Sequence, residues 1–248
     1  MEPHRLIVAL DVATARDAEA LVSRLAGLGV AFKVGSQLFT AAGPDLEAGI
    51  VRRGAKVFLD LKFHDIPSTV EMAAREAARL GAFMFDVHAL GGAEMMRAAR
   101  EGAAAGAAQA GLPRPLVIAV TVLTSHTEVS MREALGVEVR LAEQAVRLAA
   151  QAQAAGLDGV VASPHEVPAI RAACGGAFTL VTPGIRLPGA PPDDQRRTMT
   201  PAEAARAGAD YLVVGRPILG AADPAGAARA ILEDLACSSA APPHPSAA

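Results

Sequence analysis

The sequence predicts an α/β protein with a single (β/α)8 TIM barrel over residues 1–235. Short apolar runs rich in Val, Ile, Leu or Phe alternate with Ala-rich amphipathic stretches, which usually end in Gly as helices do. Eight such runs fit within 248 residues, a length typical of one closed barrel. No GxGxxG motif follows the first run, which disfavours an open dinucleotide-binding sheet.

The predicted strands are short, and helical segments separate them, as parallel βαβ units require. Two helices have a clear N-cap: Thr14 precedes residues 15–28, and Thr200 precedes Pro201 at the first helical position. The last stretch, residues 236–248, is rich in Ala, Pro and Ser, and we expect it to be disordered. The strands are expected at residues 6–11, 31–34, 56–62, 84–88, 116–121, 159–162, 179–182 and 211–214.

The composition indicates a globular protein with a local anion site at most. Hydrophobic residues make up 52% and charged residues 20%, and the net charge is −3, which argues against a nucleic-acid or anionic-membrane surface. Cys174 and Cys237 form no CxxC pair, which argues against a disulfide framework or a zinc site. We read no signal peptide in residues 1–5 and no apolar run of about 18 residues. The expected location is therefore the cytoplasm, away from membranes.

Charged side chains gather at the carboxyl ends of the predicted strands, where a TIM barrel carries its active site. Asp60 and Lys62 are two residues apart on one strand and therefore face the same side. Asp11 and Lys33 end the two preceding strands, so the four groups should lie side by side with alternating charge. Such neighbours keep carboxylates ionised and lysines protonated, and the lysines repel a metal cation. Asp60 and Lys62 alone would suggest a surface ion pair, but with Asp65 added we favour a catalytic array without a metal.

Two further segments suggest a phosphate site. Gly215 and Arg216 follow the last predicted strand, where many barrels hold phosphate through backbone N–H groups and a cation. Residues 183–197 form a long, polar, Pro/Gly-rich loop of the kind that often acts as a lid, with Arg186 and Gln195 as candidate contacts. Taken separately, these features would read as a turn glycine, a solvated arginine and a mobile surface loop.

The run from Asp60 to Thr69, DLKFHDIPST, resembles the DxKxxDIPxT signature of bacterial orotidine 5′-monophosphate decarboxylases. The resemblance extends from residue 6 to about residue 235, and residues 187–192 are the least family-like stretch. The other matching motifs are ALD at 9–11, FKVG at 32–35, HALGG at 88–92, LTS at 123–125, GLDGVV at 156–161, TPGIR at 182–186 and VGR at 214–216.

The resemblance implies conversion of orotidine 5′-monophosphate to UMP, the last step of de novo pyrimidine biosynthesis, without a cofactor. Lys62 would donate a proton to C6 of the pyrimidine, and Asp60 would lie near the departing carboxylate. Lys33 would bridge Asp60 and the ribose hydroxyls, and Asp11 would bind the ribose. Thr124 would help hold the pyrimidine.

The resemblance also implies the remaining substrate contacts and a homodimer. Asp65, a further catalytic residue, and Thr69 would reach across the dimer interface into the partner's site. The other residues that the resemblance assigns to substrate binding, including those at the phosphate and the closed lid, are Ile66, Pro183, Arg186, Gln195, Gly215 and Arg216.

Three alternatives remain open. A metal-dependent 3-keto-gulonate-6-phosphate decarboxylase or hexulose-phosphate synthase-like barrel shares the DxKxxD pattern, but such enzymes carry a carboxylate for magnesium where this chain has Lys33. A generic phosphate-binding isomerase or aldolase would need a general-base pair or a Schiff-base lysine without flanking acids. A non-enzymatic barrel would bind nucleotides or a protein partner without turnover. Magnesium dependence and turnover separate these alternatives.

Overall fold

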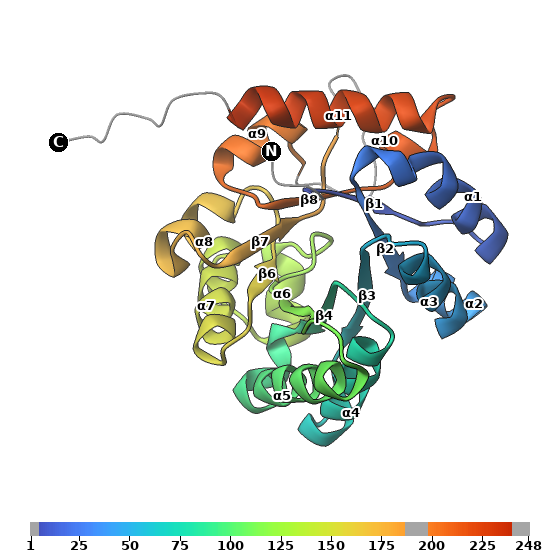
Figure 1. Cartoon of the computed structure of the whole chain (residues 1–248). Helices are drawn as coiled ribbons and strands as arrows, with labels where there is room; N and C mark the ends of the chain where they lie inside the picture. Colours follow the sequence, from blue (N-terminus) through green and yellow to red (C-terminus); the bar gives the residue numbers. More distant parts are fainter. Residues whose placement is uncertain (1–4, 187–197, 240–248) are drawn as a thin grey trace.

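The structure, a computed structural model, describes residues 5–186 and 198–239. Eight parallel strands follow one another in sequence order around a closed barrel, and β1 pairs with β8 to complete it. Helices surround the barrel, and α11 lies across β1 and β8 (Figure 1). This arrangement confirms the predicted (β/α)8 fold.

All eight predicted strands are present, with ends that differ from the prediction by at most two residues. Asp11 lies beyond β1 because only the Leu10 N–H still pairs with β2, through the Lys33 carbonyl at 2.9 Å. The chain then leaves the sheet to build the barrel mouth. The strands are β1 (Leu6–Ala9), β2 (Ala31–Gly35), β3 (Val57–Phe63), β4 (Met84–His88), β5 (Leu116–Val120), β6 (Gly159–Val161), β7 (Thr179–Thr182) and β8 (Tyr211–Val214).

The helices begin where the sequence provides caps. The Thr14 side chain accepts the Asp17 N–H at 3.2 Å, and Thr200 forms a capping box with Glu203. The helices are α1 (Ala15–Leu25), α2 (Ser36–Ala42), α3 (Pro44–Arg52), α4 (Pro67–Arg79), α5 (Gly92–Ala110), α6 (Glu128–Leu135), α7 (Leu141–Ala154), α8 (Val167–Cys174), α9 (Pro201–Ala207), α10 (Arg216–Leu219) and α11 (Pro224–Ser239), with 3-10 turns η1 (Ala26–Leu28) and η2 (Ala89–Gly91).

The end of α11 differs from the expected domain boundary at residue 235. The helix continues to Ser239, since Ala236 favours helix and the first proline beyond it is Pro242. The rest of the stretch for which we expected disorder, residues 240–248, lies outside the described residues. Within the described part of the chain, no helix combines the length and apolar character that a membrane crossing needs.

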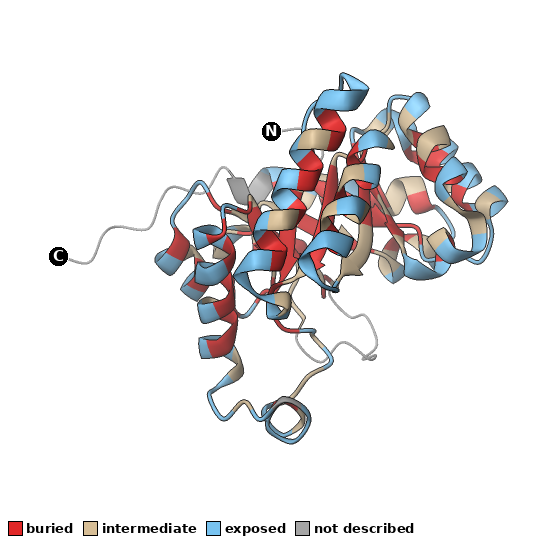
Figure 2. Cartoon of the chain, turned by 90° about the horizontal axis from the view of Figure 1, so that it is seen from below, coloured by how far each residue is buried: buried red, intermediate tan, exposed pale blue. Residues whose placement is uncertain are grey.

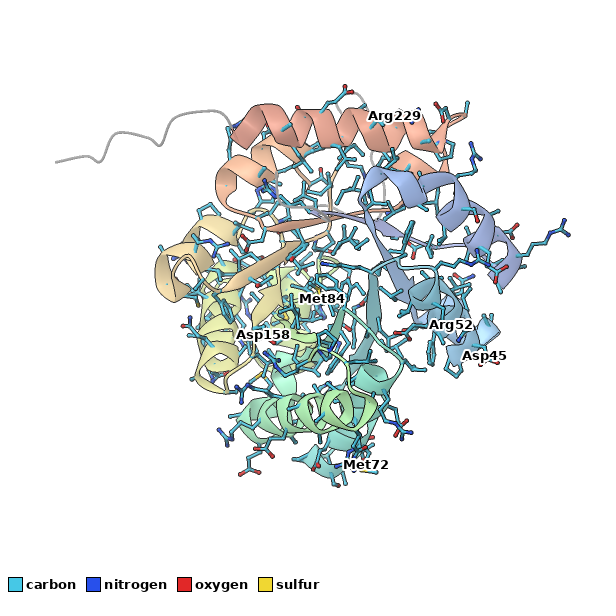
Figure 3. The ribbon with its side chains drawn as sticks, viewed as in Figure 1. Asp45, Arg52, Met72, Met84, Asp158 and Arg229 are labelled. Atoms are coloured by element: carbon cyan, nitrogen blue, oxygen red, sulfur yellow. The ribbon has the colours of Figure 1, made fainter. Side chains whose placement is uncertain are left out.

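Two apolar layers position the mouth of the barrel. The larger layer packs the helices against the outside of the sheet, and Figure 2 shows buried residues on the strands and on the helix faces toward them. A second cluster fills the barrel itself, and Met84 at its centre is labelled in Figure 3. Phe58 and Met84 belong to this inner cluster, so Asp60 and Asp86, two positions further along β3 and β4, lie on the same inward face, and Asp60 lines the cavity above the cluster. The members of the inner cluster are Ile7, Ala31, Phe58, Met84, Ile118 and Val181.

Candidate active site

A cavity of about 240 Å³ opens at the carboxyl ends of the strands. Barrels of this kind carry their active sites at that end. The structure brings together there most of the residues that the sequence singled out, from strand ends that are far apart in the chain. These residues are Asp11, Lys33, Asp60, Lys62, Thr124, Pro183, Arg186, Gly215 and Arg216.

Three of the predicted residues do not line this cavity. Asp65, Ile66 and Thr69 lie on the loop after β3 and at the start of α4, and all three are exposed in the single chain. The Asp65 side chain accepts the N–H of Ile66 at 2.6 Å, which fixes the turn into α4. Gln195 and the lid interior at 187–192 lie outside the described residues.

Four charged side chains form a continuous chain along one wall of the cavity. Lys33 Nζ lies 3.2 Å from Asp11 Oδ1 and 3.1 Å from Asp60 Oδ2. Lys62 Nζ contacts the other oxygen of Asp60. The neighbouring ends of β1, β2 and β3 therefore place these charges in the alternating order that the sequence predicted.

The array fixes the charge of its two central members. Burial acts to lower the pKa of Lys33, but the carboxylates of Asp60 and Asp11 outweigh it and raise that pKa above its ordinary value. Burial likewise acts to raise the pKa of Asp60, but the ammonium groups of Lys33 and Lys62 hold it well below its ordinary value. Lys33 is therefore a permanent cation and Asp60 a permanent carboxylate over the physiological pH range.

The opposite wall of the cavity is largely apolar. It comes from the ends of β5 and β6 and from the loop after β5, where Thr124 adds a hydroxyl group. An apolar wall with one polar group suits a flat heterocycle that makes few hydrogen bonds. The apolar residues of this wall are Val120, Val122, Leu123, Val161 and Ala162.

Cationic side chains mark the β7–β8 end of the cavity. Arg186 follows β7, and Arg216 is the first residue of α10, directly after β8. A Cβ added at Gly215 would lie 3.2 Å from Asp11 Oδ2, so glycine allows the backbone to pass close to the charged array. Two guanidinium groups beside a glycine turn suit a phosphate group.

The described residues on either side of 187–197 are joined beside this cationic end. The Arg186 N–H donates to the carbonyl of Met199 at 2.9 Å, and the Met199 N–H donates to Gly184 at 3.2 Å. Ile185 and Met199 form an isolated parallel bridge. The segment that ends at Arg186 is therefore held against Met199, and Arg186 itself lines the cavity.

Two features of this region differ from the sequence-based expectation. Asp86 was not among the predicted site residues, and the backbone conformation of Lys62 is not that of a regular strand. The prediction treated Lys62 as part of a regular strand, but its φ is +53° and the register of β3 with β4 shifts between Leu59 and Phe63. The side chain of Asp86 on β4 accepts the displaced Lys62 N–H at 2.8 Å. The sequence does contain a pattern that could have identified Asp86. It is an acid between Phe85 and Val87 in an otherwise apolar strand, and strand alternation directs it to the barrel interior.

Among the residues that the structure describes, no group of three or more His, Cys, Asp or Glu side chains is arranged to hold a metal ion. The acids of the array are instead paired with lysines: Lys33 contacts both Asp11 and Asp60. The cavity thus combines a charged wall, an apolar wall and a cationic end.

Comparisons with known proteins agree with this arrangement. Residues 4–231 match the model of the orotidine 5′-phosphate decarboxylase / HUMPS family. The orotidine 5′-phosphate decarboxylase of Moorella thermoacetica is 53% identical over 231 residues, which are 93% of this chain and 92% of that protein. Its counterpart in Geobacter sulfurreducens is 58% identical over 204 residues, 82% of this chain and 84% of that protein.

A solved structure shows the same likeness in three dimensions. The crystal structure of orotidine 5′-phosphate decarboxylase from Lactobacillus acidophilus superimposes with a TM-score of 0.85 at 40% identity, covering 94% of this chain and 99% of that chain. Both the sequence and the barrel therefore match along almost their whole length. This chain belongs to the orotidine 5′-phosphate decarboxylase / HUMPS family.

Proposed function

We propose that this protein decarboxylates orotidine 5′-monophosphate to UMP, the last step of de novo pyrimidine biosynthesis, by cofactor-free electrostatic catalysis. The observation that carries the proposal is the chain of alternating charges from Asp11 through Lys33 and Asp60 to Lys62 along one cavity wall. Family membership adds support, since the relatives compared above are orotidine 5′-phosphate decarboxylases.

The reaction needs a cation at the reacting carbon. When the bond between C6 and the carboxylate breaks, carbon dioxide leaves and the electron pair remains on C6 with no ready electron sink. We assign Lys62 to this carbon: its ammonium group stabilises the growing negative charge and then transfers a proton to C6, and water restores the lysine proton. Such preorganised electrostatic stabilisation is the largest single contribution in many enzymes. Here it must contribute to a total on the order of 20 kcal/mol.

Asp60 is proposed to act on the substrate carboxylate. Because Lys33 and Lys62 keep Asp60 ionised, its negative charge would face the negative carboxylate of the bound substrate. The departure of neutral carbon dioxide removes that repulsion, whereas the attraction between Lys62 and C6 increases. Both changes favour the transition state over the bound substrate.

The remaining cavity residues are proposed to bind the parts of the nucleotide that do not react. Asp11 and Lys33 would hold the ribose hydroxyls, and Thr124 with the apolar wall would hold the pyrimidine. Binding energy from these remote groups can offset the cost of forcing two carboxylates together. The residues proposed for the phosphate, the lid and the adjoining rim are Arg186, Gln195, Gly215, Arg216 and Pro183.

We also propose a homodimer in which Asp65 and Thr69 reach into the partner's site, with Ile66 on the same segment. These residues lie at the edge of the barrel mouth, and none of them lines the cavity of its own chain. Ile66 is 64% exposed and Met72 on α4 is 54% exposed, so this edge presents large apolar side chains that a second subunit could cover. The free thiol of Cys174 is compatible with a reducing compartment, and we propose the cytoplasm.

Lys33 also argues against the metal-dependent alternative. Its ammonium group lies within 3.2 Å of Asp11 and Asp60, so both acids already have a cation beside them. A magnesium ion at these carboxylates would have to displace or repel Lys33. No described contact favours that reaction over the decarboxylation of the nucleotide.

The test is an absorbance assay with orotidine 5′-monophosphate in the presence of EDTA. Wild-type protein is expected to consume the orotate chromophore rapidly, and Lys62→Ala is expected to lose most of that activity. Lys56→Ala is the matched control, because Lys56 precedes the same strand at its opposite end and lies over the ring of Phe83. Absence of turnover in EDTA, with decarboxylation of a different sugar phosphate once magnesium is added, would overturn the proposal.

A further inference from the structure

The buried acid Asp86 stands directly behind the reacting end of the cavity. It lies on β4, is 1% exposed, and is two residues beyond Met84 of the cluster that fills the barrel. Neither the signature motif nor the cavity lining includes it. An acid in such a position requires hydrogen-bonding partners that offset its burial.

The two oxygens of Asp86 have different partners. Oδ1 accepts the backbone N–H of Lys62 at 2.8 Å. Oδ2 has no hydrogen-bond partner among the described residues, and the neighbouring acid that acts on this carboxyl is Asp60. Two carboxyl groups can form a hydrogen bond only if one of them carries a proton.

The surrounding charges decide which of the two carries it. Asp60 is flanked by Lys33 and Lys62, which hold it ionised. Burial raises the pKa of Asp86 well above its ordinary value, and the neighbouring Asp60 carboxylate raises it further. The unpaired, buried Oδ2 and the neighbouring Asp60 carboxylate therefore both favour the protonated form of Asp86, whose proton is then available to Asp60.

The Lys62 backbone needs this partner. Among the described residues, Lys62 is the one non-glycine residue with a positive φ, and a left-handed conformation costs about 1–3 kcal/mol at such a residue. Its N–H falls in the stretch where the pairing of β3 with β4 is interrupted. The hydrogen bond to Asp86 satisfies this N–H and holds the conformation that directs the Lys62 side chain toward Asp60 and the cavity.

We propose that Asp86 is a positioning residue for the decarboxylation, which in its neutral form fixes the Lys62 backbone through one oxygen and the Asp60 carboxylate through the other. The inference rests on the proposed function, since it deepens the roles of Lys62 and Asp60. An asparagine has the same shape and offers the same two bonds: its oxygen accepts the Lys62 N–H, and its amide donates to Asp60. Alanine offers neither.

The experiment compares Asp86→Asn and Asp86→Ala in steady-state kinetics with orotidine 5′-monophosphate. Asp86→Asn is expected to keep kcat within a few-fold of wild type. Asp86→Ala is expected to lower kcat by about 10²-fold, the cost of a misplacement near 1 Å, with KM changed by only a few-fold. The ribose and phosphate contacts, which set KM, do not involve Asp86.

Asp158→Ala is the matched control for loss of an acid that accepts a strand N–H; Asp158 is half-buried and pairs with Arg114. Asp158 accepts the N–H of Val117 at 2.8 Å, a comparable strand contact at the other end of the barrel, and is labelled in Figure 3. This variant is expected to lose thermal stability but to keep kcat. A decrease in kcat as large as that of Asp86→Ala would show a general effect of barrel damage and would overturn the proposal.

The outcomes separate this inference from the proposed function. If wild type turns over the nucleotide and Asp86→Asn is as inactive as Asp86→Ala, or if both retain full kcat, the positioning role is wrong. If wild type does not turn over the nucleotide, the proposed function fails. In that case a crystal structure of Asp86→Ala still tests whether Asp86 holds the Lys62 backbone. A Lys62 that keeps its left-handed conformation refutes this role, and a Lys62 that changes to an extended conformation supports it.

Discussion

Glu47 on α3 is expected to make the stability of this protein depend on pH far from the active site. Its side chain is 0% exposed, and neither carboxyl oxygen has a hydrogen-bond partner among the described residues. Burial raises the pKa of Glu47 from 4.5 to about 8. The folded protein therefore keeps this proton at pH values at which the unfolded chain has released it.

The sign and size of the effect follow from linkage. Because the folded-state pKa of Glu47 is raised, its contribution to stability is fully present below pH 4.5 and is lost as the pH rises to about 8. Each pH unit in this window costs about 1.4 kcal/mol. The shift from 4.5 to about 8 therefore corresponds to roughly 5 kcal/mol, of which roughly 3 kcal/mol is lost by pH 7.

Glu47→Gln removes the titration but keeps the size of the side chain. The amide itself lacks partners at this site, so the absolute stability is less informative than its change with pH. We expect the free energy of unfolding of Glu47→Gln minus that of wild type to rise between pH 5 and pH 8 by about 1.4 kcal/mol per unit. An exposed glutamate on α11, Glu233, provides the control variant Glu233→Gln, for which the difference should stay flat.

The assay is urea unfolding followed by circular dichroism at several pH values, with linear extrapolation to water. Fluorescence is a poor alternative, because the chain has no Trp and a single Tyr. Parallel pH profiles for wild type and Glu47→Gln would refute the reasoning, since they would mean that Glu47 titrates alike in the folded and unfolded states. Thermal unfolding at pH 5 and pH 8 provides a second, independent comparison.

Two further predictions concern helix packing and the dimer. A Cβ at Gly102 on α5 would overlap the carbonyl of Glu71 on α4, so Gly102→Ala should lower the free energy of unfolding by about 1–3 kcal/mol. Gly27→Ala is the control, because a Cβ at Gly27 would have nothing within 4 Å and should leave the stability unchanged. Equal melting temperatures for the two variants would contradict this. Mixing inactive Lys62→Ala with inactive Asp65→Ala should restore about a quarter of wild-type activity, because half of randomly mixed dimers contain one intact site. No recovery after subunit exchange, verified by mass spectrometry, would argue against a shared site.

The strand order and the charged array were predictable because they depend on simple geometry. Parallel strands that are consecutive in sequence lie side by side in a closed barrel, so Asp11, Lys33 and Asp60 at adjacent strand ends must meet at one edge. The capping threonines Thr14 and Thr200 likewise act within a few residues of themselves. Patterns of this kind need no knowledge of distances across the fold.

The conformation of Lys62 could not be predicted in the same way. Strand alternation placed its side chain beside Asp60, and the two do meet, but the backbone between Leu59 and Phe63 is not a regular strand. A left-handed residue other than glycine persists only where the surrounding structure supports it. That support comes from Asp86, 24 residues further along the chain, and no local pattern connects the two positions.

Asp86 and Glu47 show why burial of an acid has different consequences at two places in one fold. In both, burial is the largest cause of a raised pKa. Glu47 meets no donor or acceptor in the described part of the chain, so its proton only avoids the cost of a buried charge, and stability falls once the pH favours its release. In our proposal the proton of Asp86 is donated to the Asp60 carboxylate, a bond that the ionised form cannot make. The first acid is therefore expected to affect unfolding, and the second to affect the chemical step, although the sequence shows both simply as isolated acids among apolar residues.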